Sequence, residues 1–444
     1  MKVLVIGAGY VGLVTAAGLA DSGHHVILAE RNPKRVEQLR RGRLPFYEPG
    51  LQDLVQRGMA RGSLSLTAGI TDLDESVHVV MVAVGTPSSD DGRVDLGAFD
   101  AVMEDIAAHV SGPCVVCIKS TVPVGTADRV QAQFARHGRR DLSVVSAPEF
   151  LAEGSAITDF LEPDRVVVGT RDDEAGKVMR RLYAPLLRRG VSLHLTDCRS
   201  AEMSKYASNA MLAARLSMIN EIARMCEAMG ADIDVVRRIV GDDSRIGAHY
   251  LHPGLGWGGS CLPKDVRALA AMGAQCGVDL SAVAAVGASN EIHLSAFVDR
   301  IEALLDAVEN PCVAVLGLAF KPGTDDVRES PAQRVVSRLR TMGAILRLYD
   351  PVARERFEHV LPTGKTVVFA PDAYACVEGA DLVVICTEWR EFAGLDLGVV
   401  AQRMRGRILV DGRNIVRPGD ARAAGLEYHG VGRPYRVVCT SERL

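Results

Sequence analysis

The sequence lacks the features that mark several special classes of protein. Its 51 lysines and arginines nearly balance 55 aspartates and glutamates, and no basic block could follow a phosphate backbone, so we expect no nucleic-acid partner. Its apolar runs, such as 79–84, fall far short of the roughly 20 residues that cross a bilayer. The first residues lack the charged start and apolar core of a signal peptide. These absences predict a cytoplasmic protein without a membrane partner.

Cysteine is present, but it lacks the spacing of a disulfide framework or a metal site. Ten cysteines are scattered along the chain, which suits a reducing compartment. One C-x-x-C pair, Cys114 and Cys117, lies in an apolar run typical of a strand. Strand positions three apart face opposite ways and cannot share a metal. We therefore expect a buried strand there and no bound metal.

The first part of the chain alternates apolar strands with helical segments. A length of 444 residues exceeds one hydrophobic core, so two or three domains are expected. Alternating strands and helices are typical of a parallel sheet covered on both faces. The pattern therefore predicts a doubly wound domain over residues 1–198. Its expected elements are 2–6, 10–22, 26–29, 33–40, 79–84, 96–109, 115–118, 144–146 and 166–169.

A long helical segment follows, with Ser200 as its N-cap and Gly230 as its stop. One face is apolar at helical spacing, which we interpret as core or subunit interface rather than as a cofactor site. Its members are Met203, Ala207, Ala210, Ala214, Ile219, Ile222 and Cys226. Further helices are expected at 264–275 and 282–305, so a central helical region should cover 199–305.

From residue 312 the alternation of strands and helices resumes. Residues 317–323 follow the first of these strands but lack the three-glycine spacing of residues 7–12. This difference is expected of a related sheet that binds a different ligand. The predicted fold is α/β, with two Rossmann-like doubly wound parallel-sheet domains, 1–198 and 306–444, joined by the helical region. The second domain's expected elements are 312–316, 333–341, 345–349, 367–369, 381–387 and 407–410.

A dinucleotide site is indicated by the run Gly7-Ala-Gly9-Tyr-Val11-Gly12 between a strand and a helix. Such a turn lets the backbone approach a pyrophosphate at the helix N-terminus. The next strand ends at Glu30, where a carboxylate can accept both ribose hydroxyls and repel a 2′-phosphate. This favours NAD over NADP, although Arg31 or Arg35 could pair with a phosphate. A turn needed only for helix packing would explain the glycines but not Glu30.

The run Gly254-Leu-Gly-Trp-Gly-Gly-Ser-Cys261-Leu-Pro-Lys-Asp265 predicts a reactive cysteine. Its glycines form a loop, and Pro263 suits a first helical turn, so Cys261 should lie at a helix N-terminus. The helix dipole and Lys264 would then favour the nucleophilic thiolate. Asp265, four residues on, would reach a water or a bound intermediate. A lone cysteine is more often buried and inert, but the loop and the charged pair favour reactivity.

Lys205 and Asn209 are spaced by one helical turn on the long helix, so an ammonium and an amide share one face. They are either a solvated surface pair or, beside a thiolate and a dinucleotide, groups that stabilise an alkoxide or oxyanion.

These residues, with further motifs along nearly the whole chain, resemble the UDP-glucose/GDP-mannose dehydrogenase family. The further motifs are Tyr47-Glu-Pro-Gly-Leu51, Val84-Gly-Thr-Pro87, Lys119-Ser-Thr-Val-Pro-Val-Gly-Thr126, Pro148-Glu-Phe-Leu-Ala-Glu-Gly-Ser155, Pro163-Asp-Arg-Val166, Phe320-Lys-Pro-Gly-Thr-Asp-Asp-Val-Arg-Glu-Ser-Pro331, Thr387-Glu-Trp389 and Asp411-Gly-Arg-Asn414.

The resemblance implies oxidation of a nucleotide sugar's C6 alcohol to a carboxylate in two hydride transfers, through a thioester on Cys261. Lys205 and Asn209 would hold the C6 oxygen. Asp265 and Thr121 would manage water and protons, and Glu153 would assist near the reacting carbon.

The resemblance also implies binding residues and a homodimer or larger homo-oligomer. NAD would be bound by Gly7, Gly9, Val11, Gly12, Glu30, Arg35, Thr86, Thr121, Lys264 and Arg328. The nucleotide sugar would be bound by Glu149, Phe150, Leu151, Ala152, Lys205, Tyr250, Gly254, Gly258, Phe320, Lys321 and the Arg245 of a neighbouring subunit.

Several positions depart from the family's pattern. Glu30 replaces the more frequent Asp, while Ala147 and Ala152 stand where many relatives have Asn and Arg. UDP-glucose is the favoured substrate because residues 149–156 and 159–166 resemble that branch. GDP-mannose, or glucose on another nucleotide, is the alternative substrate. A nucleotide-sugar-binding regulatory protein without catalysis is the alternative class, but Cys261 and its partner residues are all present.

Overall fold

The computed structural model describes residues 1–71, 76–89 and 91–434. The chain forms two compact units, the first comprising Met1–Ser208 with Ala271–Gly277, and the second comprising the remainder. The predicted division into 1–198, 199–305 and 306–444 is finer than this and stays a prediction. Within the described residues, no helix has both the length and the apolar character that crossing a membrane requires.

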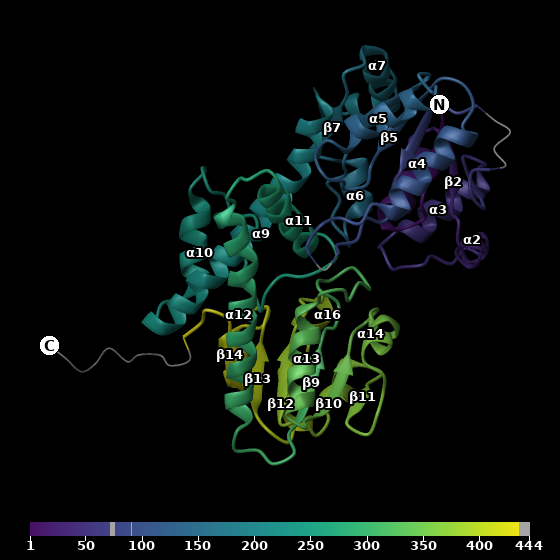
Figure 1. Cartoon of the computed structure of the whole chain (residues 1–444). Helices are drawn as coiled ribbons and strands as arrows, with labels where there is room; N and C mark the ends of the chain where they lie inside the picture. Colours follow the sequence, from purple (N-terminus) through teal and green to yellow (C-terminus); the bar gives the residue numbers. More distant parts are fainter. Residues whose placement is uncertain (72–75, 90, 435–444) are drawn as a thin grey trace. The chain divides into compact units, whose positions relative to one another are not determined.

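The first unit, coloured purple to blue in Figure 1, is built on an eight-stranded sheet with the order β3-β2-β1-β4-β5-β6-β7-β8. Along β1, Val3 and Val5 pack into one core, and Leu4 and Ile6 pack into a second core on the other face. Both faces are buried, which confirms the predicted doubly wound arrangement. The strands are β1 (Lys2–Ile6), β2 (His25–Ala29), β3 (Leu64–Thr67), β4 (Val79–Val82), β5 (Cys114–Ile118), β6 (Leu142–Ser146), β7 (Arg165–Gly169) and β8 (Ser192–Thr196).

The C-x-x-C pair lies within the buried strand β5, as predicted. Cys114 packs into one core of the sheet and Cys117 into the other. Burial raises the pKa of both thiols to about 12. These cysteines are therefore protonated packing residues on opposite faces.

One step of this sheet is antiparallel, which the sequence did not predict. All neighbouring strands run parallel except β6 and β7, which pair where Ser146 faces Gly169. The connection between them, residues 147–164, carries the short helix α6 (Ala156–Leu161) and leads into β7 running opposite to β6. As a result Arg165, at the start of β7, lies at the edge of the sheet where β6 ends.

Helices cover the first sheet, and side-chain caps define several of their starts. Asn32 accepts hydrogen bonds from the backbone of Lys34 and Arg35 at the start of α2, and Asp172 caps α7 in the same way. The helices are α1 (Tyr10–Asp21), α2 (Pro33–Arg40), α3 (Leu51–Ala60), α4 (Gly97–His109), α5 (Thr126–Arg136), α6, α7 (Asp173–Leu182) and α8 (Ala184–Leu187).

The long helix α9 (Cys198–Met229) begins two residues before the predicted start. Ser200 is not its cap: Asp197 accepts from the Ser200 amide at 3.0 Å and from the Ser200 hydroxyl at 2.6 Å. Asp197, the residue directly before α9, therefore fills the capping position that was predicted for Ser200. Gly230 ends the helix at φ +73°, as predicted.

The second unit contains most of the central helices and a six-stranded sheet with the order β11-β10-β9-β12-β13-β14, parallel throughout the described residues. Its strands are β9 (Cys312–Leu316), β10 (Ile345–Tyr349), β11 (Val367–Phe369), β12 (Leu382–Ile385), β13 (Ile408–Asp411) and β14 (Glu427–Gly430). Its helices are the rest of α9, α10 (Ile233–Asp242), α11 (Leu262–Gln275, of which 271–275 belong to the first unit), α12 (Ser281–Leu305), α13 (Pro331–Thr341), α14 (Arg354–Val360), α15 (Ala373–Val377), α16 (Arg390–Ala393), α17 (Leu397–Arg403) and α18 (Pro418–Ala423).

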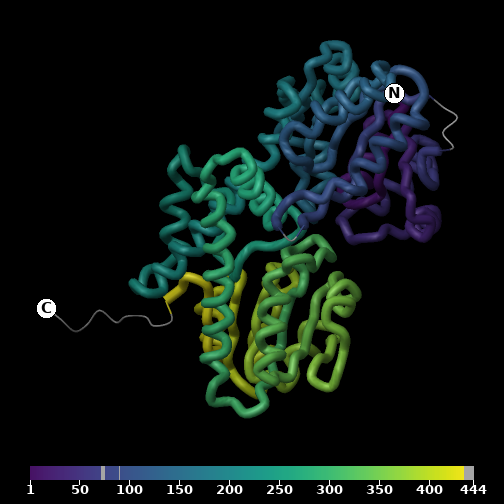
Figure 2. Tube along the Cα trace, viewed as in Figure 1, coloured from purple at the N-terminus to yellow at the C-terminus, as the bar shows by residue number. Residues whose placement is uncertain are grey.

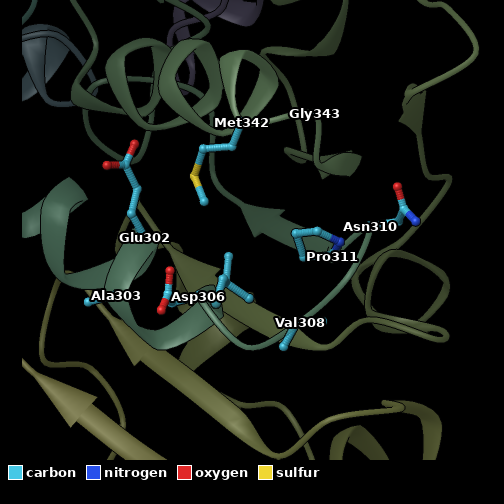
Figure 3. Close-up of a pocket in the computed structure, with 9 residues that line it drawn as sticks. Glu302, Ala303, Asp306, Val308, Asn310, Pro311, Met342 and Gly343 are labelled. Carbon is cyan, nitrogen blue, oxygen red and sulfur yellow. The ribbon is translucent and has the colours of Figure 1, made fainter.

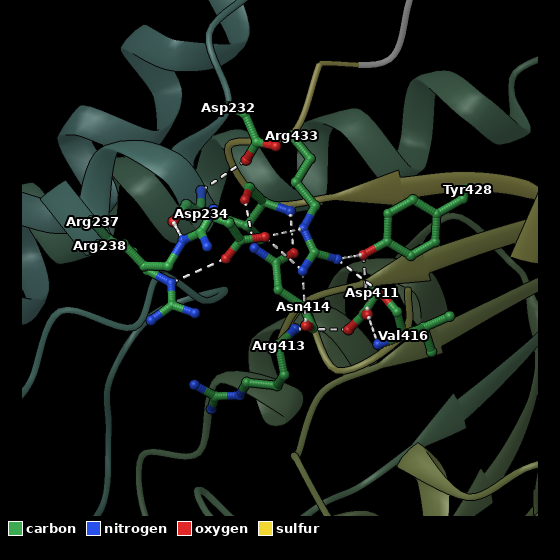
Figure 4. Close-up of polar contacts among 11 residues, drawn as sticks. Asp232, Asp234, Arg237, Arg238, Asp411, Arg413, Asn414, Val416, Tyr428 and Arg433 are labelled. Atoms are coloured by element: carbon green, nitrogen blue, oxygen red, sulfur yellow. Dashed lines mark hydrogen bonds and ion pairs between the residues drawn. The ribbon is translucent and has the colours of Figure 1, made fainter. Parts of the chain in front are cut away.

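The segment after β14 joins the second sheet to helix α10, beside which it runs in Figure 2. Arg433 is the centre of this junction: its guanidinium donates to Asp234 on α10 at 2.7 Å, to the Val416 carbonyl at 2.9 Å and to the Tyr428 hydroxyl (Figure 4). Tyr428 in turn donates to the fully buried Asp411 at 3.1 Å. Burial raises the pKa of Asp411, although backbone amides oppose the shift. The network fixes α10 against the carboxyl edge of the second sheet.

Candidate active site

The glycine turn after β1 meets three different steric demands. Gly7 has φ +101°, and a Cβ there would lie 2.7 Å from the Ala83 carbonyl oxygen. A Cβ at Gly12 would lie 1.8 Å from the Gly7 carbonyl oxygen, whereas a Cβ at Gly9 would meet nothing within 4 Å. Gly7 and Gly12 therefore permit the tight turn and close helix packing. Gly9, directly before α1 with Val11 in its first turn, leaves the backbone open to an anion at the helix N-terminus.

Glu30 is held against this turn by bonds from three groups. Its carboxylate accepts from the Ala8 amide at 3.1 Å, from the Asn32 amide at 2.8 Å and from Arg35 Nη1 at 3.2 Å. Arg35 is thus bound to the carboxylate that would repel a 2′-phosphate. This geometry fits a cofactor with two free ribose hydroxyls, as the sequence predicts.

The loops after β4 and β5 are joined by Thr86 and Thr121. The Thr86 hydroxyl donates to the Thr121 carbonyl at 2.8 Å. Farther along the second loop, Glu202 of α9 accepts from the amides of Gly125 at 2.6 Å and Ala127 at 2.9 Å. Burial raises the pKa of Glu202 to about 7. Glu202 therefore anchors the loop that presents Thr121, a role that no sequence pattern indicated.

Lys205 and Glu149 form a buried ion pair in the first unit. Lys205 Nζ lies 3.0 Å from Glu149 Oε1, and the two side chains are only 4% and 6% exposed. The other oxygen of Glu149 accepts from the Leu151 amide at 2.5 Å. The Phe150 ring lies 5.6 Å from Lys205 Nζ and 4.0 Å from the guanidinium carbon of Arg165. The solvated-surface interpretation of Lys205 is therefore wrong.

Glu48 organises the segment that follows Glu149. It is 4% exposed and accepts from the amides of Ala156 at 2.8 Å and Gly154 at 2.6 Å and from the Tyr10 hydroxyl at 2.5 Å. This carboxylate fixes the turn containing Glu153 against the start of α1. The sequence singled out the motif around Glu48 but assigned it no role.

Ala152, which stands where many relatives have Arg, is held by its backbone. Its amide donates to Asp159 Oδ2 at 2.8 Å, and its carbonyl accepts from the Tyr10 hydroxyl at 3.5 Å. The position therefore orients the segment 149–153 without a functional side chain.

In the second unit, Asp265 is buried between an amide and an ammonium. Asn209 Nδ2 donates to its Oδ2 at 2.5 Å, and Lys264 Nζ pairs with its Oδ1. Asp265 is 1% exposed and Asn209 is 6% exposed, so Asn209 is not a surface residue either. The two residues that the sequence placed one turn apart on α9 therefore hold different acidic partners, Glu149 and Asp265.

Cys261 lies directly before α11, as predicted. The Asp265 amide donates to the Cys261 carbonyl at 2.9 Å, which makes Cys261 the residue from which the helix starts. Its side chain is exposed, and its sulfur lies 3.6 Å from the Ser260 hydroxyl. An accessible thiol at a helix N-terminus is the environment that favours a nucleophilic thiolate.

The loop before Cys261 is clamped by buried polar side chains from two helices. The Asn290 amide group accepts from the Trp257 amide and donates to the Trp257 carbonyl, both at 3.0 Å. Asn220 accepts from the Gly254 amide at 3.0 Å, and His293 donates to the Gly254 carbonyl at 2.7 Å. Asn220 belongs to α9, whereas Asn290 and His293 belong to α12. Sequence reasoning missed all three because isolated polar residues on helices carry no local signal.

Arg413 completes the clamp from the end of β13. It donates to the carbonyls of Cys386 at 2.8 Å, Phe320 at 3.1 Å and Gly256 at 3.3 Å. It therefore ties three loop segments of the second unit together.

The glycines of this loop allow it to approach neighbouring backbone closely. A Cβ at Gly258 would lie 1.9 Å from the Glu329 carbonyl oxygen, and a Cβ at Gly259 would lie 2.7 Å from the Phe320 ring. The Gly259 amide donates to the Arg328 carbonyl at 3.1 Å. Glycine is therefore required at both positions by packing.

The residues expected to hold a nucleotide lie on loops of the second unit. Phe320 and Lys321 follow β9, and Lys321 Nζ lies 5.6 Å from the Phe320 ring centre. Tyr250 has φ +59°, and the Arg328 guanidinium is paired with Asp326 at 2.6 Å. Arg245 is 86% exposed and is paired with Asp243 of the same unit at 2.6 Å.

We expect His293 to make this unit sensitive to acid. Burial lowers the pKa of His293 to about 4, while the unfolded side chain titrates near 6.5. Below pH 6.5 the imidazole becomes protonated in the unfolded chain but stays neutral in the folded chain. The free energy of unfolding therefore decreases as the pH falls from about 6.5 to 4. Between pH 7.5 and pH 5, the free energy of unfolding measured with urea should fall by about 2 kcal/mol more for the wild type than for His293→Gln. Glutamine keeps a hydrogen-bond donor for the Gly254 carbonyl but does not titrate. Equal losses would contradict the assignment.

One hollow in the second unit does not belong to this site. It has a volume of about 440 Å³ and lies at the edge where β9 begins, opposite the loops that follow β9 (Figure 3). None of its lining residues is among the predicted site residues.

Comparisons with known proteins agree with the resemblance seen in the sequence. Residues 1–187, 199–292 and 314–418 match the NAD binding, central and UDP binding domains of the UDP-glucose/GDP-mannose dehydrogenase family. A UDP-glucose 6-dehydrogenase of Pseudomonas aeruginosa is 43% identical over 99% of both chains, and one of Bacillus subtilis is 39% identical over 98% of both chains. The structure is similar to that of a UDP-glucose dehydrogenase of Pyrobaculum islandicum, with a TM-score of 0.88 and 38% identity over 97% of this chain and 98% of that one.

Proposed function

Because the chain belongs to the UDP-glucose/GDP-mannose dehydrogenase family, we propose that it oxidises the C6 alcohol of UDP-glucose to a carboxylate. The single observation that carries the proposal is Cys261 at the start of α11, beside the buried group of Asn209, Asp265 and Lys264. An exposed thiol at a helix N-terminus suits covalent catalysis, which nucleotide-sugar binding alone does not require.

The cofactor is NAD, and the first unit has the residues to hold it. The open backbone at Gly9 would receive the pyrophosphate, and the Glu30 carboxylate would accept the ribose hydroxyls. Thr86 and Thr121 would line the path of the nicotinamide half. Lys264 and Arg328 of the second unit remain proposed contacts of the cofactor. Bound NAD supplies the hydride acceptor for both oxidations.

Lys205 and Asn209 would stabilise the C6 oxygen as it loses its proton. Each is already oriented by a carboxylate, Lys205 by Glu149 and Asn209 by Asp265. Fixed charges and dipoles in a buried setting stabilise a developing alkoxide more strongly than water does, because they need no reorganisation. The Lys205–Glu149 pair is also the group to which the alcohol proton would pass.

Cys261 would attack the C6 aldehyde formed by the first oxidation, giving a thiohemiacetal. Loss of a second hydride converts this adduct to a thioester, which water hydrolyses to the carboxylate and the free thiol. Asp265, with Thr121, would accept a proton from that water, and Glu153 would assist near the reacting carbon. The clamp of Asn220, Asn290, His293 and Arg413 would hold the sulfur's loop in place.

The sugar nucleotide would be bound through loops that the structure holds rigidly. The segment Glu149-Phe150-Leu151-Ala152 would contact the sugar, fixed from behind by Glu48 and Asp159. Tyr250, Gly254, Gly258, Phe320 and Lys321 would contact the nucleotide diphosphate, together with Arg245 of a second copy of the chain.

The proposal is tested by incubating the purified protein with NAD and each of several nucleotide sugars. We expect two NADH per UDP-glucose and far slower turnover with GDP-mannose, and with NADP in place of NAD. Faster turnover of GDP-mannose would instead favour the other named branch of the family. Absence of NADH with every sugar would contradict an enzymatic function altogether.

We also propose a cytoplasmic homodimer formed through α9. Exposed methionines follow that helix at heptad spacing, Met211, Met218 and Met225, with exposures of 67%, 58% and 60%. Three exposed methionines in one stripe are unusual for a solvated surface, and a stripe along one helix can pair with its own copy across a twofold axis. A second copy of the chain is therefore the partner that fits this face.

Met218→Glu should dissociate the dimer. Placing two like charges at the centre of a twofold apolar interface costs several kcal/mol, so dimer affinity should fall by about 100-fold or more. Light scattering coupled to gel filtration measures the change. Met342→Glu, at an exposed methionine that does not lie on α9, is the matched control and should leave the mass unchanged. A wild-type protein that is monomeric at micromolar concentration would contradict the interface.

A further inference from the structure

A cavity in the first unit lies directly behind the Glu149 segment. It has a volume of about 120 Å³ and is lined by Lys119, Glu149 and Tyr183 at its buried part. These three residues are 7%, 6% and 3% exposed. The lining also includes Glu162 and Asp164, which are exposed residues between α6 and β7. The cavity thus extends from a buried charged group to carboxylates at the surface.

The Tyr183 hydroxyl lacks a hydrogen-bond partner that a water in the cavity would supply. This hydroxyl is buried and finds no hydrogen-bond partner among the residues that the structure describes. A buried hydroxyl without a partner costs about 1–3 kcal/mol, and proteins normally avoid this cost with an ordered water. A water needs roughly 10–15 Å³ of accessible volume and polar neighbours, and this cavity offers both.

Lys119 places a titratable group at the inner end of the cavity. It follows β5, and within the described chain its ammonium forms no ion pair, whereas the nearby Glu149 is paired with Lys205. Burial lowers the pKa of Lys119, whereas the charge of Glu149 opposes the shift. A buried amine of this kind exchanges protons more readily than a surface lysine does.

The proposed reaction requires such an exchange. Oxidation of a primary alcohol to a carboxylate by two NAD, with one water, yields two NADH and three protons. The first proton leaves the alcohol at Lys205 and Glu149, which are both buried. A path from this pair to the solvent is therefore needed in every turnover.

We propose that the cavity behind Glu149 is a water-filled outlet through which protons pass from the Lys205–Glu149 pair, by way of Lys119 and Tyr183, to the surface at Glu162 and Asp164. The proposal rests on the proposed function. It gives roles to Lys119 and Tyr183 as relay residues that act through water and do not touch the substrate.

The test compares Tyr183→Phe with Thr15→Val. Thr15 lies on α1 in the same unit, and its hydroxyl is likewise buried without a partner among the described residues, but it does not line the cavity. Both variants therefore remove one unpartnered hydroxyl at nearly constant volume. Stopped flow with a pH indicator in weak buffer follows proton release, while absorbance follows NADH.

In the wild type and in Thr15→Val, protons and NADH should appear together. In Tyr183→Phe, proton release should lag behind NADH and kcat should fall about 5-fold, less than the 10²–10⁴-fold of a direct acid–base residue, with KM unchanged. Lys119→Met should show the same lag. Thermal unfolding adds a second readout, because Thr15→Val should stabilise the protein whereas Tyr183→Phe should not if its hydroxyl binds water.

The outlet would be overturned if Tyr183→Phe released protons together with NADH, kept its kcat and was stabilised as much as Thr15→Val. This result would indicate that the cavity contains no water. This result differs from failure of the proposed function, which would appear as the absence of NADH in the wild type and would remove the outlet with it.

Discussion

Cys261→Ser should abolish formation of the carboxylate while leaving NAD binding intact. A serine hydroxyl at the start of α11 remains protonated at neutral pH, so capture of the aldehyde and the thioester route are lost. We expect the steady-state rate of NADH formation to fall by about 10³-fold or more, the scale seen when a covalent nucleophile is removed. Steady-state NADH formation and fluorescence titration with NAD measure the two effects.

The matched control is Cys276→Ser. Cys276 is the other exposed cysteine of the described chain and directly follows the opposite end of the same helix, away from the helix N-terminus. Its replacement should leave turnover unchanged. If Cys261→Ser completed both oxidations at the normal rate, the covalent mechanism would be refuted. If it also lost NAD binding, the cysteine would have a structural role that its exposure does not suggest.

Lys205→Met should reduce both stability and activity. Removing the ammonium leaves Glu149 as a buried carboxylate whose ion-pair partner is gone, and breaking a buried pair costs about 3–5 kcal/mol. The same change removes a fixed charge from the proposed alkoxide site, which should lower kcat by about 10²–10³-fold. Urea unfolding and NADH formation measure the two losses separately.

The double variant Lys205→Met with Glu149→Leu separates structure from chemistry. Replacing both partners by apolar side chains of similar size removes the unpaired charge, so most of the stability should return. Activity should not return, because the alkoxide has still lost its cation. Recovery of kcat in the double variant would mean that Lys205 serves only to neutralise Glu149.

Features set by residues close together in the sequence were predictable. The glycine turn, Glu30 at the end of the next strand, and Cys261 before a helix all depend on local backbone geometry, and each lies where the sequence predicts it. The strands and helices that the sequence predicted lie within a few residues of their observed bounds, whereas others, such as α5, α10 and β14, were not predicted. One small difference is the start of α9, which begins at Cys198 because Asp197, and not Ser200, caps the helix.

Features set by contacts between distant segments were not predictable. The antiparallel step between β6 and β7, the anchoring of the Glu149 segment by Glu48, and the clamp on the loop before Cys261 are examples. Glu48 and Ala156 are 108 positions apart, and Arg413 and Gly256 are 157 positions apart. No periodicity or spacing connects residues at such separations in a single sequence.

The sequence by itself determined the glycine turn, many of the strands and helices, and which residue types carry the chemistry, because turns, caps and strand alternation depend on near neighbours. Only the tertiary structure decided that Lys205 is paired with Glu149 and Asn209 with Asp265, and that both are buried. The physical reason is that a polar side chain on a helix is equally compatible with water and with a buried partner. Packing of segments far apart in the chain selects between the two, and that selection determines the charge and hydrogen bonding on which the proposed reaction depends.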